Sequence, residues 1–271
     1  MGVFWTELYI LSNIKVMIKS KKSLGQNFLT NTTIVSSIAD EGNITPNETI
    51  LEIGPGKGVL TEELLKRGAK VIAIEKDTEL LPYLEGKFSK ALSEKRLTLI
   101  QGDILNYEVL FEEKYKVIAN IPYYITGLII RKFLSEQIQP ERMVLLVQKE
   151  VAERIVAQNK KESLLSISIK IYGTPKYIKT VKAVNFNPIP KVDSAILLIE
   201  NISRNFLGSV SEKRFFEVLH AGFSHKRKQL FGNLKAVFEE KALKIKMESA
   251  HILQNTRAES LSKENWLELS K

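Results

Sequence analysis

The segment NIPYYIT, residues 120–126, places an amide, a proline and two tyrosines directly after the apolar run KYKVIA. An amide can both donate and accept hydrogen bonds, proline stiffens a turn, and an aromatic ring offers a flat face. A strand that merely ends would need none of these groups together. The combination predicts a site that holds a flat, polar heterocycle.

A glycine-rich turn and two acids point to a nucleoside-containing ligand. LEIGPGKGVLT carries Gly54, Gly56 and Gly58, which let the backbone bend sharply and approach a ligand closely. Their spacing is neither that of the dinucleotide fingerprint nor that of the Walker loop. Glu75 in IAIEKD suits two ribose hydroxyls, and Asp103 in QGDIL suits an adenine amino group.

These residues follow apolar runs that alternate with amphipathic stretches, which predicts a doubly wound, mostly parallel seven-stranded α/β sheet. A helix is expected over VLTEELLKRG, with Leu60, Leu64 and Leu65 on one face and Gly68 at its end. The expected strands are TILEI, KVIAIE, LTLIQ, KVIAN, MVLLVQ, SISIKIY and SAILLIE. Ligands of such sheets bind beyond the carboxyl ends of the strands.

After residue 200 the pattern changes to helices joined by basic turns, which predicts a small helical carboxyl-terminal domain. We therefore expect a catalytic domain over residues 21–202, a helical domain over 203–271, and an extension of unknown role over 1–20. The amino-terminal stretch lacks a cleavage site typical of a signal peptide, and Met17 is an alternative start.

The composition favours one class of partner and excludes several kinds of site. The 271 residues carry a formal net charge of +9, which favours a polyanionic partner, although a solvated basic surface would show the same excess. The chain has no cysteine, which excludes disulfides, thiolate metal sites and a cysteine nucleophile. Its three histidines are scattered, so no metal site is expected. No run approaches the ~18 apolar residues of a membrane span.

The glycine loop, Glu75 and QGDIL resemble motifs of class I S-adenosylmethionine-dependent methyltransferases. The resemblance implies that Gly54 contacts the methionine part of that cofactor, Glu75 its ribose and Asp103 its adenine, with Gly56 in the same loop. KKSLGQNFL resembles the segment that closes over the cofactor in the rRNA adenine dimethyltransferase family, where Asn27 and Leu29 would add contacts. Asn27 would equally suit a helix or turn cap.

In this resemblance NIPY is the motif of methyltransferases that modify an exocyclic amine. The side-chain carbonyl of Asn120 and the backbone carbonyl of Ile121 would accept the two N–H bonds of adenine N6. Pro122 would stiffen the turn, and Tyr123 would stack on the base. The sequence then departs from the common continuation at Tyr124 and Gly127, which concerns the fine shape of the pocket.

Two further segments indicate the nucleic acid. NFNPIPKVDSAILLIE resembles a stretch of the same family in which Phe186 would stack on the opposite face of the base, and Asp193 favours the small-subunit branch. A proline-stiffened loop would also explain this stretch. In AGFSHKRKQLFGNL, Lys226, Arg227 and Lys228 would grip RNA backbone, although a basic run also suits a solvated surface.

The leading hypothesis is an S-adenosylmethionine-dependent enzyme, without a metal, that dimethylates N6 of two adjacent adenosines near the 3′ end of small-subunit rRNA. It would act as a cytoplasmic monomer within an assembling subunit, away from membranes. Two alternatives stay open: a large-subunit rRNA methyltransferase of the macrolide-resistance type, and a non-catalytic RNA-binding assembly factor.

Overall fold

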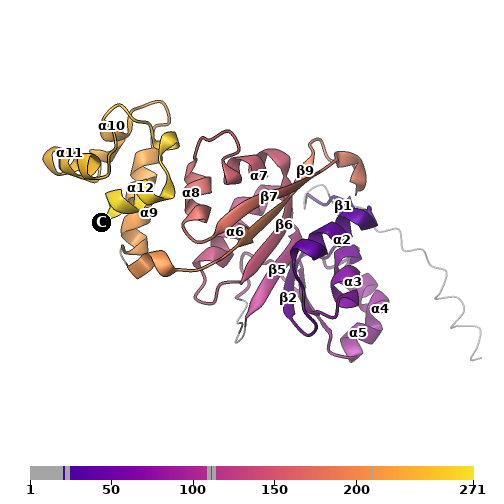
Figure 1. The fold of residues 1–271 in the computed structure, drawn as a ribbon. Coiled ribbons are helices and arrows are strands. Elements are labelled where there is room, and N and C mark those ends of the chain that lie inside the picture. Colours follow the sequence, from indigo (N-terminus) through magenta and orange to yellow (C-terminus); the bar gives the residue numbers. More distant parts are fainter. Residues whose placement is uncertain (1–20, 22–24, 109–110, 112–113, 209) are drawn as a thin grey trace, which may run out of the picture.

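The computed structural model describes residues 21, 25–108, 111, 114–208 and 210–271, so the expected extension over 1–20 lies outside the described residues. A seven-stranded sheet forms their centre, in the order β4-β3-β2-β5-β6-β9-β7 (Figure 1). Within this sheet β9 runs in the opposite direction to the other six strands, so that it is antiparallel to both β6 and β7. The strands are β2 (Thr49–Ile53), β3 (Lys70–Glu75), β4 (Leu97–Gln101), β5 (Tyr115–Asn120), β6 (Arg142–Gln148), β7 (Thr174–Val181) and β9 (Ser194–Glu200).

The central strands are apolar on both faces because helices cover both sides of the sheet. Alternate residues of β6 show this: Met143, Leu145 and Val147 pack into one core, whereas Val144 and Leu146 pack into the other. The second core is closed by α2 (Thr32–Glu41), α3 (Val59–Lys66), α4 (Leu81–Lys87) and α5 (Ser89–Ser93). The first is closed by α6 (Thr126–Ser135), α7 (Lys149–Val156) and α8 (Leu164–Lys170).

One expected strand is wrong: SISIKIY forms most of helix α8. Its Leu164, Ile167 and Ile171 are also spaced for one helix face, so the segment satisfies both periods. A capping box at the start of the segment stabilises the helix over the strand. Ser163 Oγ accepts from the backbone N of Ser166 at 3.1 Å, and Ser166 Oγ accepts from the N of Ser163 at 2.6 Å.

The seventh strand is β7, which was not expected. TPKYIKTV contains a proline and two exposed lysines, features that weaken a strand pattern. They are tolerated because β7 lies at the edge of the sheet and pairs only with β9. Proline and lysine on an edge also discourage pairing with another chain.

The carboxyl-terminal part is helical, as expected, with α9 (Glu212–Phe223), α10 (Leu230–Leu234), α11 (Glu240–Ser249) and α12 (Lys263–Ser270). Its core is continuous with that of the sheet: Tyr172 stacks on Phe216 with ring centroids 6.2 Å apart, and its hydroxyl donates a hydrogen bond to Oε1 of Glu212 at 2.5 Å. The domain boundary at residue 202 stays a prediction. No helix among the described residues is long and apolar enough to cross a membrane.

Candidate active site

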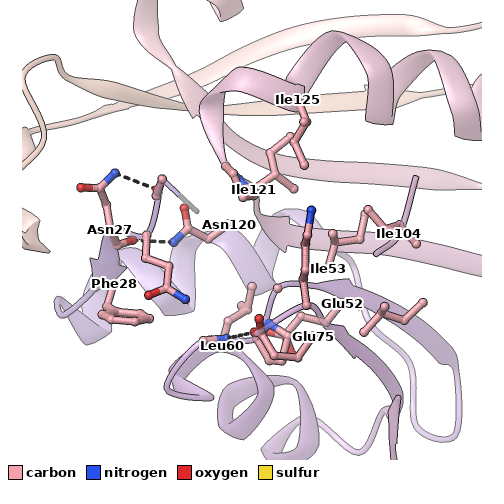
Figure 2. A pocket seen from close by; sticks show the side chains of 18 of the residues that line it. Asn27, Phe28, Glu52, Ile53, Leu60, Glu75, Ile104, Asn120, Ile121 and Ile125 are labelled. Atoms are coloured by element: carbon pink, nitrogen blue, oxygen red, sulfur yellow. Dashed lines mark hydrogen bonds between the residues drawn. The ribbon is translucent and has the colours of Figure 1, made fainter. Parts of the chain in front are cut away.

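The carboxyl ends of β2, β3, β4 and β5 border one pocket (Figure 2). This is where the order of a doubly wound sheet places its ligand site. The pocket brings together Asn27, Leu29, Gly54, Gly56, Glu75, Asp103 and the turn Asn120–Tyr123, as predicted from the sequence. Residues nearly a hundred positions apart therefore share one cavity.

The glycine loop follows β2 and turns with positive φ at Gly54, Gly56 and Gly58, at 65°, 59° and 69°. No heavy atom lies within 4 Å of the position that a Cβ of Gly54 would take, so this backbone borders open space. At Gly56, a Cβ would approach the ring of Phe28 to 3.0 Å. The loop is therefore open towards the pocket at Gly54 and packed against the segment 25–29 at Gly56.

Glu75 ends β3 with its carboxylate held by two backbone donors. Oε2 accepts from the N of Gly56 at 3.1 Å and Oε1 from the N of Asp77 at 2.8 Å. Burial raises the pKa of this carboxyl, and the backbone hydrogen bonds oppose that shift. Each carboxylate oxygen can accept a second hydrogen bond, so Glu75 can receive two hydroxyl donors from a ligand.

Asp103 follows β4 and pairs with Lys76, whose Nζ lies 2.8 Å from Oδ2. The backbone N of Leu105 donates to Oδ1 at 3.0 Å. The hydrogen bond from Lys76 lowers the pKa of Asp103, so the aspartate is an ionised acceptor at neutral pH. Lys76 was not identified from the sequence, although it lies between Glu75 and Asp77 in the same EKD triplet.

Glu52 also lines the pocket and is almost completely buried, at 1% exposure. Burial raises its pKa to about 8, even though Thr61 donates a hydrogen bond to Oε2 at 2.6 Å. Glu52 is therefore mostly protonated at neutral pH. Glu52 was not predicted from the sequence, although its place in LEIG, two residues before the first loop glycine, is a signal for it.

Asn120 ends β5 and its amide is oriented by the segment that precedes α2. Nδ2 donates to the backbone carbonyl of Asn27 at 3.2 Å (Figure 2). A carbonyl can only accept, so this bond assigns the nitrogen of the amide and leaves Oδ1 as the atom free to accept. The side chain of Asn27 itself donates to the carbonyl of Gly25 at 3.2 Å, a local turn bond like the alternative considered for it.

Ile121, Pro122 and Tyr123 continue from β5 along the pocket wall. Pro122 has φ −59° and leads into the 3₁₀ turn η2 (Tyr123–Ile125), after which α6 begins. The Tyr123 hydroxyl lies 2.7 Å from the Oγ of Ser194, at the start of β9. Ser194 is fully buried, so it holds the ring of Tyr123 from the protein interior. Ser194 was not predicted from the sequence as a partner of Tyr123.

Hydrogen bonds to Asp77 fix the residues that precede Asn27 in the sequence. Lys21 Nζ lies 2.6 Å from Oδ1 of Asp77, and Gln26 Nε2 donates to Oδ2 at 2.8 Å. Asp77 is buried, at 4% exposure, which by itself raises its pKa, but the hydrogen bonds from Lys21 and Gln26 outweigh that effect and lower the pKa. Asp77 thus fixes the residues that bring the Asn27 carbonyl to Asn120, a role the sequence did not indicate.

Phe186 is not brought to the pocket. It is 2% exposed and belongs to the core of the α2–α5 face, where strand β8 (Phe186–Asn187) pairs with β1 (Phe28–Leu29). In this arrangement Phe186 has no exposed face to offer a base, and its stacking on the target base stays a prediction. The aromatic residue exposed at the pocket is Tyr124, which is 61% exposed and whose ring would lie 3.3 Å from a Cβ placed on Gly25.

Lys226, Arg227 and Lys228 lie in the turn between α9 and α10, and all three are exposed. Within the described part of the chain, none of them forms an ion pair. The turn is held by Asn233, whose Nδ2 donates to the carbonyls of Gly222 at 2.7 Å and His225 at 3.2 Å. The three cations are therefore presented to solvent by an ordered turn.

Comparison with known proteins identifies the family. The model of the ribosomal RNA adenine dimethylase family matches residues 17–271. The chain belongs to this family. Among curated relatives of this dimethylase, a protein of Dehalococcoides mccartyi is 40% identical over 93% of the chain and 88% of its own length. A protein of Fusobacterium nucleatum is 39% identical over 93% and 97%. Both are named ribosomal RNA small subunit methyltransferase A.

Solved structures agree on the fold. A dimethyladenosine transferase from Plasmodium falciparum covers 89% of this dimethylase chain and 95% of its own, with 28% identity and a TM-score of 0.77. The 23S rRNA methyltransferase ErmE covers 90% and 98%, with 24% identity and a TM-score of 0.74. The second likeness concerns the fold alone.

Proposed function

We propose that this dimethylase transfers methyl groups from S-adenosylmethionine to N6 of two adjacent adenosines near the 3′ end of small-subunit rRNA. The product is N6,N6-dimethyladenosine, formed within an assembling subunit. One observation supports the proposal most strongly. The amide of Asn120 is oriented by a hydrogen bond to the Asn27 carbonyl, and it lies at the edge of a pocket lined by a glycine loop and two acidic residues.

The residues present fit the cofactor. Gly54 borders open space where a side chain would intrude, Glu75 can receive the ribose hydroxyls, and Asp103 can accept from the adenine amine. Phe28, packed on Gly56, closes the pocket from the amino-terminal side. When bound, S-adenosylmethionine supplies an electrophilic methyl group.

The protein's contribution to the reaction is positioning. Asn120 Oδ1 accepts one N–H of adenine N6, and the Ile121 carbonyl accepts the other, so the nitrogen is drawn out of conjugation with the ring. Tyr123, fixed by Ser194, supports the face of the base. Orientation of this kind is worth roughly 7–11 kcal/mol in well-aligned reactions. The amine becomes acidic as it is alkylated, so no strong general base is required.

The test uses unmethylated small ribosomal subunits and cofactor carrying a labelled methyl group. We expect label at two neighbouring adenosines near the 3′ end of the rRNA, recovered as N6,N6-dimethyladenosine after nuclease digestion and mass spectrometry. Label on large-subunit rRNA instead would favour the resistance-type alternative. RNA binding without any methyl transfer would favour the assembly-factor alternative.

Asp193, which favoured the small-subunit branch, has a structural role as well. Its carboxylate binds Lys182 Nζ at 2.9 Å and the backbone N of Ala183 at 3.0 Å, closing the loop before β9. We also propose that the chain acts as a monomer in the cytoplasm. Lys226, Arg227 and Lys228 would bind the RNA backbone, because exposed cations release counterions from phosphates.

A further inference from the structure

The loop between β7 and β9, residues 182–193, carries apolar side chains that point into solvent. Val184 is 73% exposed, Ile189 65% and Val192 39%. Eight large apolar side chains are exposed among the described residues, and three of them belong to this loop. Several exposed apolar side chains in one loop indicate a surface that meets a partner, because apolar groups gain by leaving water.

This loop borders the candidate active site on two sides. At its carboxyl end Ser194 holds the hydroxyl of Tyr123 at 2.7 Å. In its middle, Phe186 pairs with Leu29, and the carbonyl of Asn185 accepts from the N of Thr30 at 2.9 Å. Tyr123 and Leu29 both line the pocket. The exposed apolar residues therefore lie beside the place where the target base would enter.

The loop is built to hold these side chains outward. Phe186 is buried and anchors its centre, while Asp193 closes its base through Lys182 and Ala183. Asn185 adds two bonds, from Nδ2 to the carbonyl of Lys182 at 2.9 Å and from Asn31 Nδ2 to its Oδ1 at 2.8 Å. Two prolines, Pro188 and Pro190, restrict the backbone on either side of Ile189.

We propose that Val184 and Ile189 form a wedge that enters the base stack of the substrate RNA and fills the space left by the extruded adenosine. The inference rests on the proposed function. A base in a stack cannot reach a recessed pocket, so it must be turned out at a cost of a few kcal/mol. An inserted apolar side chain offsets part of that cost by restoring contact with the neighbouring bases.

Charge favours RNA as the occupant of this surface. Lys191 is exposed next to the wedge and, within the described residues, has no acidic partner. Lys182, on the other side, is also largely exposed, although it pairs with Asp193. Apolar tips flanked by lysines match a stack of bases flanked by phosphates.

The test is the double variant Val184→Ser/Ile189→Ser in the full-length chain. The probe is an RNA hairpin whose loop carries two adjacent adenosines, with 2-aminopurine in place of one of them to report unstacking by fluorescence. With saturating protein we expect the fluorescence rise to fall to about half or less of that with the unmodified chain. Methylation of the all-adenosine hairpin should slow about tenfold, equivalent to about 1.4 kcal/mol.

A matched control is Ile245→Ser/Leu253→Ser. These two apolar side chains are equally exposed, at 57% and 72%, but belong to the region of α11 and the turn after it. The control should behave as the unmodified chain, and thermal unfolding should show that both variants are folded. Equal fluorescence and equal rates in the wedge variant and the unmodified chain would overturn the wedge.

Other outcomes separate the explanations. A variant with weaker RNA binding but a full fluorescence rise at saturation would make the loop a general RNA contact and overturn the wedge. The double variant could also show a normal fluorescence rise and a normal methylation rate on the hairpin but lose activity on assembled subunits. That result would mean that the loop docks on a subunit protein, and it would also overturn the wedge. If the unmodified chain methylates neither hairpin nor subunits, the proposed function fails instead.

Discussion

The hydroxyls of Tyr123 and Ser194 lie 2.7 Å apart although 71 positions separate them in the sequence. Tyr123 stands in the turn that follows β5, and Ser194 begins β9, two strands away in the sheet. The buried Ser194 thus fixes the position of the Tyr123 ring, which is proposed to support the target base.

This pair predicts that Ser194→Ala slows methylation without weakening cofactor binding, because it frees the Tyr123 ring and leaves the glycine loop intact. We expect a loss of roughly fivefold to tenfold, the size of one neutral hydrogen bond. Tyr123→Phe should give a similar loss, and the double variant should be no worse than either single variant. Additive losses in this double-mutant cycle would mean that the two hydroxyls act independently.

Asn120→Ala should abolish most methyl transfer, because it removes the oriented acceptor for adenine N6. Removal of one fixed polar group at a reacting centre costs on the order of a hundredfold or more in rate. Single-turnover methylation measures the loss, and filter binding of RNA should change little. Methylation at the unmodified rate would show that Asn120 has no catalytic role.

Asp77→Asn should weaken cofactor binding, because it releases Lys21 and Gln26 and so loosens the segment that carries Asn27. Hydrogen bonds to a charged group contribute about 1.5–3 kcal/mol, so we expect roughly tenfold weaker binding by calorimetry. Glu79→Gln is the matched control. Glu79 also pairs with Lys21, at 3.0 Å, but it is 75% exposed and should contribute little. Equal effects of the two variants would contradict the role of Asp77.

The free energy of unfolding should fall as pH rises from about 5 to 8. The pKa of Glu52 is raised from 4.5 to about 8 by burial, so the folded chain keeps a proton that the unfolded chain loses in this range. The stabilisation is complete below pH 4.5 and is lost as pH rises through 8. Each pH unit in that window costs about 1.4 kcal/mol from this group.

Denaturant unfolding at several pH values measures this dependence. Glu52→Gln keeps an acceptor for Thr61 and cannot ionise, so its unfolding free energy should vary less with pH than that of the unmodified chain. Glu75, whose pKa is also raised by burial, leaves a slope of the same sign in this variant. An unchanged slope in Glu52→Gln would show that Glu52 is already ionised in the folded chain.

Replacing Lys226, Arg227 and Lys228 with alanine should weaken RNA binding and flatten its dependence on salt. Each lost phosphate contact reduces the slope of log K against log salt by about 0.7–0.9. The control removes three exposed lysines near strands β3 and β4, outside the helical carboxyl-terminal region: Lys70, Lys90 and Lys95. If both triple variants change the slope equally, the effect is one of net charge and not of a defined RNA contact.

The local pattern of residues in the sequence determined most of the sheet and the residues of the pocket. Six of the seven sheet strands were predicted, because short runs of β-branched and leucine residues favour strands buried on both faces. The pocket residues were predicted because parallel strands all end at one edge, so Gly54, Glu75, Asp103 and Asn120 had to meet there. The segment 164–170 was ambiguous, since its apolar residues fit both periods, and only its packing and capping box chose the helix.

Contacts between distant segments were decided by the tertiary structure alone. The hydrogen bonds from Asn120 to Asn27, from Gln26 to Asp77 and between Tyr123 and Ser194 depend on how loops from separate elements meet. The same holds for Phe186, an aromatic residue whose type suits both a stacking face and a core anchor. Sequence reports residue type and spacing along the chain, whereas burial depends on which neighbours the whole fold supplies, and that placed Phe186 inside and left Val184 and Ile189 outside.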